Sequence, residues 1–242
     1  MIQYISLPDS VKDLIDSLPP ESLLIPIVDG EKTKAFIIHP DEYQRLVSSS
    51  SSEQQLASLE DAYINFLIIV ASAMDSHEAY FAGHTGRVTM LASALAEQLN
   101  LSSAFIQDIR LAALLHDIGE VVIPNDILNK VGKLTQDEYE VLRQHPTIGS
   151  QIVATVSRLE RVAEIIHDHH EKYDGTGYPN GIKGEEIPLG ARILSIVDAY
   201  DAMTNLRTNR ENIDHDQAML ELQRNNATAF EPYLLQEFEK IF

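Results

Sequence analysis

From about residue 54 onward, apolar residues recur at the 3.6-residue spacing of amphipathic helices. The first stripe covers 56–70, two more cover 88–99 and 106–115, and helices are also expected over 162–167 and 191–203. Thr135 and Glu138 form the capping box of a further helix that should run to about Gln144. Residues 171–188 break the rhythm with glycines and prolines, and loops of that length are usually functional. The pattern predicts a mainly α domain over 54–242.

The first fifty residues follow another pattern. Apolar segments at 23–28 and 35–38 flank Asp29-Gly30 and predict a hairpin-like strand pair, although Pro26 weakens the first strand. A short helix with a proline near its start is expected over 40–46. The serine run at 48–52 is the best domain boundary. We therefore expect a small N-terminal α/β module over 1–50 with a regulatory or dimerisation role.

Charge and composition limit the classes of molecule that the chain is expected to bind. The chain has 37 acidic and 18 basic residues, a formal net charge of −19, and no cysteine. Such a surface repels DNA, RNA and anionic lipid at long range, so we expect no DNA partner. A phosphate substrate would need local attraction from metal ions and a few placed cations. The lack of cysteine excludes disulfides, iron–sulfur clusters and thiolate zinc sites.

The longest apolar stretch, Tyr63 to Met74, is short for a membrane helix, which needs roughly 20 residues. It is better explained as a buried helix or as one that pairs two subunits, so a homodimer is a further expectation. The N-terminus lacks the basic and apolar regions of a secretory signal. We therefore expect a cytoplasmic protein without a membrane span.

The nine histidines are used unevenly. Four have no special surroundings and are expected to serve on the surface or in the core: His39, His77, His167 and His215. The other five stand at helix ends or on helix faces beside carboxylates: His84, His116 with Asp117, His145, and His169 with His170. Asp198 lies in an apolar run, where burying a carboxylate is costly unless a cation or donor meets it. Nitrogen and oxygen donors in this number suit six-coordinate iron or manganese better than tetrahedral zinc.

The motifs that carry these residues resemble those of the HD-GYP family, in family order over roughly residues 80–210. They are His84-x-x-Arg87, His116-Asp117-Ile118-Gly119, Ile123-Pro124, Gly132-Lys133-Leu134-Thr135, His145-Pro146, His169-His170-Glu171, Asp174-Gly175-x-Gly177-Tyr178-Pro179, Ile187 to Ile193, and Asp198-x-x-Asp201-Ala202-Met203-Thr204. Many separate short patterns at suitable spacings are unlikely to coincide by chance.

The resemblance implies an HD-fold helical bundle that binds two divalent transition metals, iron or manganese, and hydrolyses cyclic di-GMP to linear pGpG and in some members to GMP. Trinuclear members place a glutamate four residues before the first histidine; this chain has Tyr80 there, so two metals are expected. The metal ligands would be His84, His116, Asp117, His145, His169, His170 and Asp198.

Other roles also follow from the resemblance. Asp117 would bridge the metals, and Asp117 and Asp201 are candidates for orienting a bridging hydroxide or moving its proton. Substrate would be bound by Tyr178, Lys133, Arg207 and Arg210. Family members often work with a signalling protein, so such a partner is expected here without being identified.

One position departs from the family. Its HD motif normally continues with a lysine that reaches a substrate phosphate, whereas this chain has Glu120. Three explanations compete: the substrate is bound differently through Lys133, Arg207 and Arg210; the substrate is another phosphorylated nucleotide; or the domain keeps its metals but works mainly as a catalytically weak signalling or scaffold module.

Overall fold

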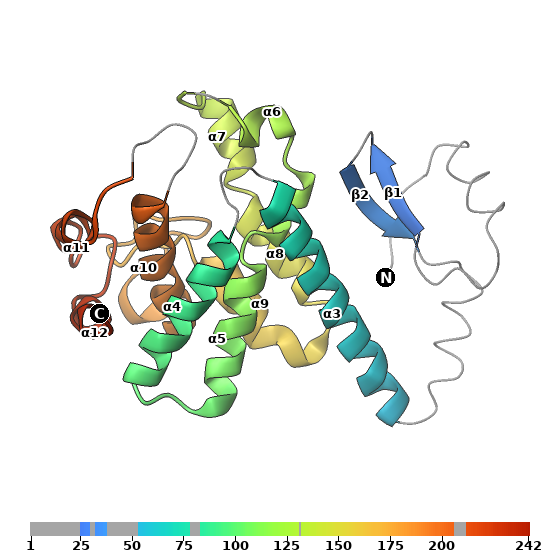
Figure 1. The fold of residues 1–242 in the computed structure, drawn as a ribbon, viewed down its shortest axis with the longest axis horizontal. Helices are drawn as coiled ribbons and strands as arrows, with labels where there is room; N and C mark the ends of the chain where they lie inside the picture. The colour runs from blue at the N-terminus through green and yellow to red at the C-terminus, as the bar shows by residue number, and fades with distance from the viewer. Residues whose placement is uncertain (1–24, 30–31, 38–52, 78–82, 131, 206–211) are drawn as a thin grey trace. The chain divides into compact units, whose positions relative to one another are not determined.

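The structure is a computed structural model that describes residues 25–29, 32–37, 53–77, 83–130, 132–205 and 212–242 (Figure 1). It divides the chain into two units, Met1–Ala62 and Tyr63–Phe242. In the first unit, β1 (Ile25–Asp29) pairs antiparallel with β2 (Lys32–Ile37), and Ile25 lies opposite Ile37. The predicted strand pair is confirmed. The expected helix over 40–46 and the serine boundary lie outside the described residues.

The second unit is helical, as predicted. Its helices are α3 (Glu53–His77, which begins in the first unit), α4 (His84–Gln98), α5 (Ser103–Leu115), α6 (Asn125–Leu128), α7 (Gln136–Leu142), α8 (His145–Val153), α9 (Glu160–Asp168), α10 (Leu189–Thr204), α11 (His215–Arg224) and α12 (Pro232–Glu239). Three 3₁₀ turns interrupt them: η1 (Ile118–Val122), η2 (Ser157–Leu159) and η3 (Gly184–Glu186). Within the described ranges, every helix is too short or too polar to cross a bilayer.

The local signals in the sequence explain most of the helix boundaries. The capping box of α7 is present: the Thr135 hydroxyl accepts from the Glu138 amide while the Glu138 carboxylate accepts from the Thr135 amide. Pro146 stands in the first turn of α8, where its missing N–H costs nothing. The sequence pattern did not predict α8, α11 and α12 as helices.

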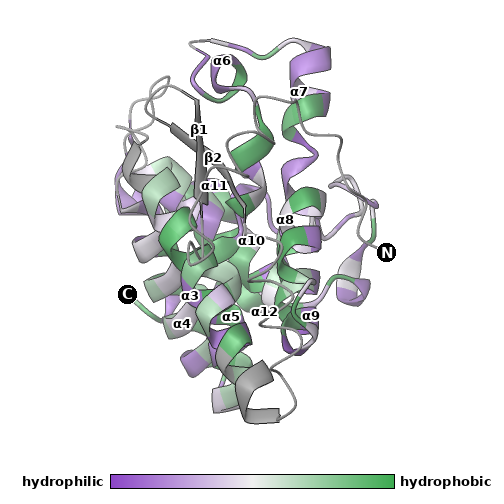
Figure 2. Ribbon diagram, turned by 90° about the vertical axis from the view of Figure 1, so that its right-hand side faces the viewer, coloured by the Kyte–Doolittle hydropathy of each residue, from purple (hydrophilic) through white to green (hydrophobic). Residues whose placement is uncertain are grey.

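The hydrophobic core lies between α4, α5, α9 and α10 and extends to α11 and α12. Figure 2 shows hydrophobic residues concentrated where these helices meet. The largest fully buried side chains include Leu95, Ile109, Ile165, Ile193, Leu222 and Phe238. Each such burial stabilises the fold by roughly 1.5–3 kcal/mol. The core therefore holds the ends of several helices in fixed positions, and the candidate site is built at those ends.

Gly119 allows the turn η1 to lie directly against the start of α8. A Cβ at this position would lie 2.0 Å from the His145 carbonyl oxygen and 2.6 Å from the Gly149 amide nitrogen. Both atoms are backbone, so neither can move aside cheaply. A side chain at position 119 would therefore push two candidate ligand segments apart.

We expect Gly119→Ala to destabilise the protein by about 1–3 kcal/mol or more, because overpacking against backbone forces a shift of η1 or α8. Gly86→Ala is the matched control: a Cβ there meets nothing within 4 Å. It should stabilise α4 by roughly 0.5–1 kcal/mol, the usual gain from replacing a helical glycine. Chemical denaturation of the two variants and the wild type measures both effects. Equal stability of Gly119→Ala and wild type would show that η1 does not pack this closely.

Candidate metal centre

All seven predicted ligands converge on one region from different elements. Each stands at or near the end of a helix, except Asp198, which lies within α10. His84 begins α4, His116 caps the C-terminus of α5 and is followed by Asp117, His145 begins α8, and His169 caps the C-terminus of α9 and is followed by His170. The structure thus brings together residues that are far apart in the sequence.

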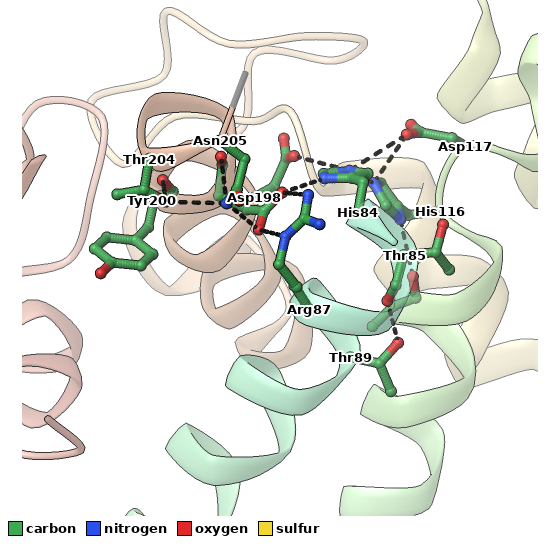
Figure 3. Close-up of polar contacts among 12 residues, drawn as sticks. His84, Thr85, Arg87, Thr89, His116, Asp117, Asp198, Tyr200, Thr204 and Asn205 are labelled. Atoms are coloured by element: carbon green, nitrogen blue, oxygen red, sulfur yellow. Dashed lines mark hydrogen bonds and ion pairs between the residues drawn. The ribbon is translucent and has the colours of Figure 1, made fainter. Parts of the chain in front are cut away.

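Three of these residues form a first group of donors. One ligand atom from each of His84, His116 and Asp198 lies within 4.8 Å of the others. The His84 Nε2 atom is 3.4 Å from His116 Nε2 and 3.5 Å from the Asp198 carboxylate. Figure 3 shows His84 between Asp198 on one side and His116 and Asp117 on the other.

His145, His169 and His170 form a second group, again with ligand atoms within 4.8 Å of one another. The ring centroids of His169 and His170 are 4.1 Å apart, and the His145 ring lies 5.4 Å and 5.0 Å from these two rings. The second group therefore offers three imidazole nitrogens.

Asp117 lies between the two groups and presents one carboxylate oxygen to each. Its Oδ2 atom is 3.0 Å from His116 Nε2, and its Oδ1 atom is 3.6 Å from His145 Nε2. A carboxylate in this position can donate one oxygen to each of two cations. The geometry therefore supports the bridging role expected from the sequence.

The imidazoles are oriented for metal binding. In three of them Nδ1 lies 2.6–2.9 Å from the carbonyl oxygen of the residue three positions earlier: His116 to Ala113, His145 to Leu142, and His169 to Ile166. A carbonyl only accepts, so Nδ1 carries a proton, and in the neutral form of each ring the lone pair is on Nε2. The Nε2 atoms of His145 and His169 are buried and have no hydrogen-bond partner among the described residues. Orphaned buried nitrogens with an outer hydrogen bond are what a metal site requires.

Burial and charge act in opposite directions on these groups. Burial opposes the charged form of His116, but the neighbouring Asp117 carboxylate overrides it and raises the pKa of His116 to about 10. Burial likewise opposes the charged form of Asp117, yet His116 holds the pKa of Asp117 well below its usual range. Burial lowers the pKa of His145 and, more strongly, that of His169. A metal ion would therefore compete with a proton for His116, whereas the lowered pKa values of His145 and His169 favour the neutral imidazole that can bind a metal ion.

Asp201 lies beside His84 and contacts the Nδ1 atom of its ring. Its Oδ2 atom accepts hydrogen bonds from His84 Nδ1 at 2.7 Å and from an Arg87 terminal nitrogen at 3.0 Å. Its Oδ1 atom accepts from Arg87 Nε at 2.6 Å and from Asn205 at 2.9 Å. Burial raises the pKa of Asp201, but the hydrogen bonds from His84 and Arg87 outweigh it and lower the pKa overall. Both oxygens are engaged, which favours a role for Asp201 in orienting His84; its predicted role in orienting a hydroxide or moving its proton stays a prediction.

Tyr178 lies beside the second group. Its ring is 4.9 Å from the His170 ring, and the Arg143 guanidinium lies 4.7 Å from the centre of the Tyr178 ring. Arg143 caps the C-terminus of α7 and was not among the predicted site residues. Its place two residues before His145 was the signal available in the sequence. A cation thus stands next to the metal ligands.

The loop that carries Tyr178 is anchored by Glu171, which is 2% exposed. One Glu171 carboxylate oxygen accepts hydrogen bonds from the amides of Asn180 and Gly181 at 2.6 and 2.9 Å. The Tyr178–Pro179 peptide bond is cis. The motif that contains Glu171 did not indicate a role for it; in the structure its carboxylate holds this loop in place.

The remaining predicted residues fall into two sets. Lys133 is exposed in the segment between α6 and α7. Arg207, Arg210 and Tyr80 lie outside the described residues. Two histidines expected to have ordinary roles do have them: His167 pairs with Asp168, and the His215 ring lies 2.9 Å from the Tyr200 hydroxyl.

Proteins of known sequence resemble this chain over most of its length. Residues 69–234 match the HD domain family. A cyclic di-GMP phosphodiesterase of Thermotoga maritima is 31% identical over 91% of this chain and 62% of its own length. The cyclic di-GMP phosphodiesterase response regulator RpfG of Xanthomonas campestris is 36% identical over 78% of this chain and 49% of its own length. A 3′3′-cGAMP-specific phosphodiesterase of Vibrio cholerae is 35% identical over 85% of this chain and 45% of its own length. The chain thus spans about half to three-fifths of these relatives.

Solved structures share the fold. A cyclic GMP-AMP-specific phosphodiesterase of Vibrio cholerae has a TM-score of 0.59 at 23% identity, over 74% of this chain and 48% of its own. A protein of Bdellovibrio bacteriovorus described as an HDG"Y"P protein has a TM-score of 0.56 at 21% identity, over 82% of this chain and 67% of its own. At these identities the likeness establishes the fold, which is the predicted HD helical fold. With the matched HD domain and relatives of this kind, the chain belongs to the HD domain family and to its HD-GYP branch.

Proposed function

We propose that this chain is a metal-dependent phosphodiesterase that hydrolyses cyclic di-GMP to linear pGpG, and on to GMP. The observation that carries the proposal is the position of Asp117, which presents one oxygen to each of two histidine groups. Relatives named as cyclic di-GMP and 3′3′-cGAMP phosphodiesterases support a cyclic dinucleotide as the substrate.

The site would hold two divalent transition ions, iron or manganese. One would be bound by His84, His116 and Asp198, and the other by His145, His169 and His170, with Asp117 shared. Nitrogen and oxygen donors without sulfur favour these metals. When bound, such a pair supplies Lewis acidity toward phosphoryl oxygens and lowers the pKa of a water molecule. The chain's own contribution is to hold the ligands and to orient His84 through Asp201.

The substrate would lie beside the second group, where Tyr178 and Arg143 meet. A pocket of about 420 Å³ lies next to Tyr178; its lining includes Glu140, Arg143, Gln144 and Thr147 but none of the predicted metal ligands. Burial raises the pKa of Tyr178, so its hydroxyl stays protonated and can donate a hydrogen bond to a phosphate. In a chain of net charge −19, the Arg143 guanidinium would supply local positive charge to an anionic ligand, partly offset by the Glu140 carboxylate 3.6 Å away. Lys133, Arg207 and Arg210 remain predicted substrate contacts.

Three further expectations stay predictions: a regulatory role for residues 1–50, a signalling protein or second copy of the chain as partner, and a cytoplasmic location. The alternative of a catalytically weak signalling module is kept open only by Glu120. The full set of seven metal ligands argues against it, because a decayed site would be expected to lose ligands.

Turnover tests the proposal directly. Anaerobically purified protein loaded with iron or manganese should convert cyclic di-GMP to pGpG in a chromatographic assay, with 3′3′-cGAMP run in parallel. Asp117→Ala should abolish turnover, because it removes the shared ligand of both ions. Asp126→Asn, an exposed acidic residue on α6, is the control and should retain full activity. A fully metal-loaded wild type that cleaves neither substrate would refute the proposed activity.

The role of Asp201 predicts a loss of metal affinity. Asp201→Asn removes the charge that faces His84 Nδ1, and partners of this kind are worth roughly 10- to 100-fold in metal affinity. Competition with a chelating dye measures this for Mn²⁺. Asn205→Ala, which removes only the neighbouring amide, should have a much smaller effect. Unchanged affinity in Asp201→Asn would mean that Asp201 supports the fold alone.

Arg143 is expected to act on substrate binding. Arg143→Gln should raise the KM for cyclic di-GMP roughly 10-fold or more, because a hydrogen bond to a charged group contributes about 1.5–3 kcal/mol. Arg143→Lys should recover part of the loss, since it keeps the charge but loses the planar fork. Arg161→Gln removes an exposed arginine paired with Asp108 and controls for net charge. If both glutamine variants raise the KM equally, Arg143 does not contact the substrate.

A further inference from the structure

Glu120 lies in the turn η1 directly after the shared ligand Asp117. The Glu120 amide donates a hydrogen bond to the Asp117 carbonyl oxygen at 2.8 Å, which is the i to i+3 bond of a 3₁₀ turn. Side chains three residues apart eclipse each other in such a turn. The local backbone therefore places the Glu120 carboxylate above that of Asp117.

The Glu120 carboxylate also lies near His145, one member of the second histidine group. One oxygen of Glu120, one oxygen of Asp117 and one ring nitrogen of His145 all lie within 4.8 Å of one another. Donors on opposite sides of one transition ion are about 4–4.4 Å apart, given bonds of about 2.0–2.2 Å. Small side-chain rotations would therefore let all three bind the same cation.

A separate observation indicates that a ligand belongs here. His145 is 2% exposed, and its Nε2 atom has no hydrogen-bond partner among the residues that the structure describes. The Leu142 carbonyl occupies Nδ1, so Nε2 must be an acceptor, and it is directed toward Asp117 at 3.6 Å. Such a buried acceptor can be satisfied by a cation, and neither nearby carboxylate can donate to it while ionised.

Repulsion between carboxylates points the same way. Glu120 is half-buried, and two ionised carboxylates that lie close together repel each other whatever other partners each of them has. A divalent ion in contact with both removes this repulsion. Glu120 is then compatible with a phosphate substrate, because its charge is directed to the metal.

We propose that Glu120 is a ligand of the ion bound by His145, His169 and His170, at the position where the family resemblance leads one to expect a lysine. The inference rests on the proposed metal centre. It gives this ion three imidazoles and two carboxylate oxygens, against two imidazoles and two carboxylate oxygens for its neighbour. An extra oxygen donor favours a hard ion such as Mn²⁺ in six-coordinate geometry and still leaves one position open.

Metal binding tests the assignment without recourse to activity. Apo-protein is titrated with Mn²⁺ by calorimetry, and the retained metal is counted by elemental analysis after dialysis against a chelator. The wild type should bind two ions. Glu120→Gln keeps the shape of the side chain but loses the charge, and it should bind one of the two ions at least about 10-fold more weakly, the lower limit for outer-sphere partners. Glu120→Asp should recover part of the affinity, whereas Asp126→Asn, a nearby exposed acid, should match the wild type.

Other outcomes overturn the assignment in distinguishable ways. If Glu120→Gln binds both ions as tightly as the wild type, Glu120 is not a ligand, although the two-metal centre stands. If the wild type binds three ions and Glu120→Gln loses the third, Glu120 belongs to a separate site. If the folded wild type binds no divalent ion at all, the proposed centre fails and this inference with it. Circular dichroism of each apo-variant confirms that changes in affinity do not reflect unfolding.

Discussion

The main constraint on this fold is the free-energy penalty of burying two histidine nitrogen atoms. The bundle buries the Nε2 atoms of His145 and His169 without giving them a hydrogen-bond partner among the described residues, and each such atom costs about 1–3 kcal/mol. A cation that accepts both lone pairs turns this cost into binding energy, so metal affinity and folding stability are coupled. The close packing at Gly119 then has a clear purpose, because it fixes the distance between Asp117 and His145.

Helix ends solve two problems at once in this site. The last carbonyls of an α-helix lack intrahelical partners, and a histidine just beyond the end can donate to one of them. His116 at the end of α5 and His169 at the end of α9 both do so, to carbonyls in the last turn. The same hydrogen bond selects the tautomer that leaves Nε2 free. The backbone at the ends of α5 and α9 therefore orients His116 and His169, whereas the Asp201 side chain orients His84.

The helical domain, the strand pair and the seven residues that meet in the candidate centre could be predicted from the sequence, because hydrophobic spacing and short motifs are local signals; that these residues bind metal stays a prediction. It did not allow the role of Asp201 to be predicted. Asp198 and Asp201 are three residues apart on α10, and only the packing of α10 against α4 decides that the first faces the centre while the second holds His84. The contact between Arg143 and Tyr178 could not be predicted for the same reason, because it exists only once α7 and the loop that carries Tyr178 lie together. The helices α11 and α12 were missed although each has a local start signal, the N-cap Asp214 for α11 and Pro232 in the first turn of α12.

Charge balance bears on how so acidic a chain would bind the proposed phosphate substrate. Asp201 is compensated by Arg87, so it contributes little to the field at the centre. Two divalent ions facing Asp117, Asp198 and Glu120 would leave an excess of about one positive charge, where a lysine in place of Glu120 would leave about three. The attraction to phosphate would then be weak and short-ranged, and the nearby Arg143 guanidinium would carry a correspondingly larger share of it. A site of this kind selects its substrate by the fit of the phosphate between the ions and Arg143, and long-range attraction contributes little.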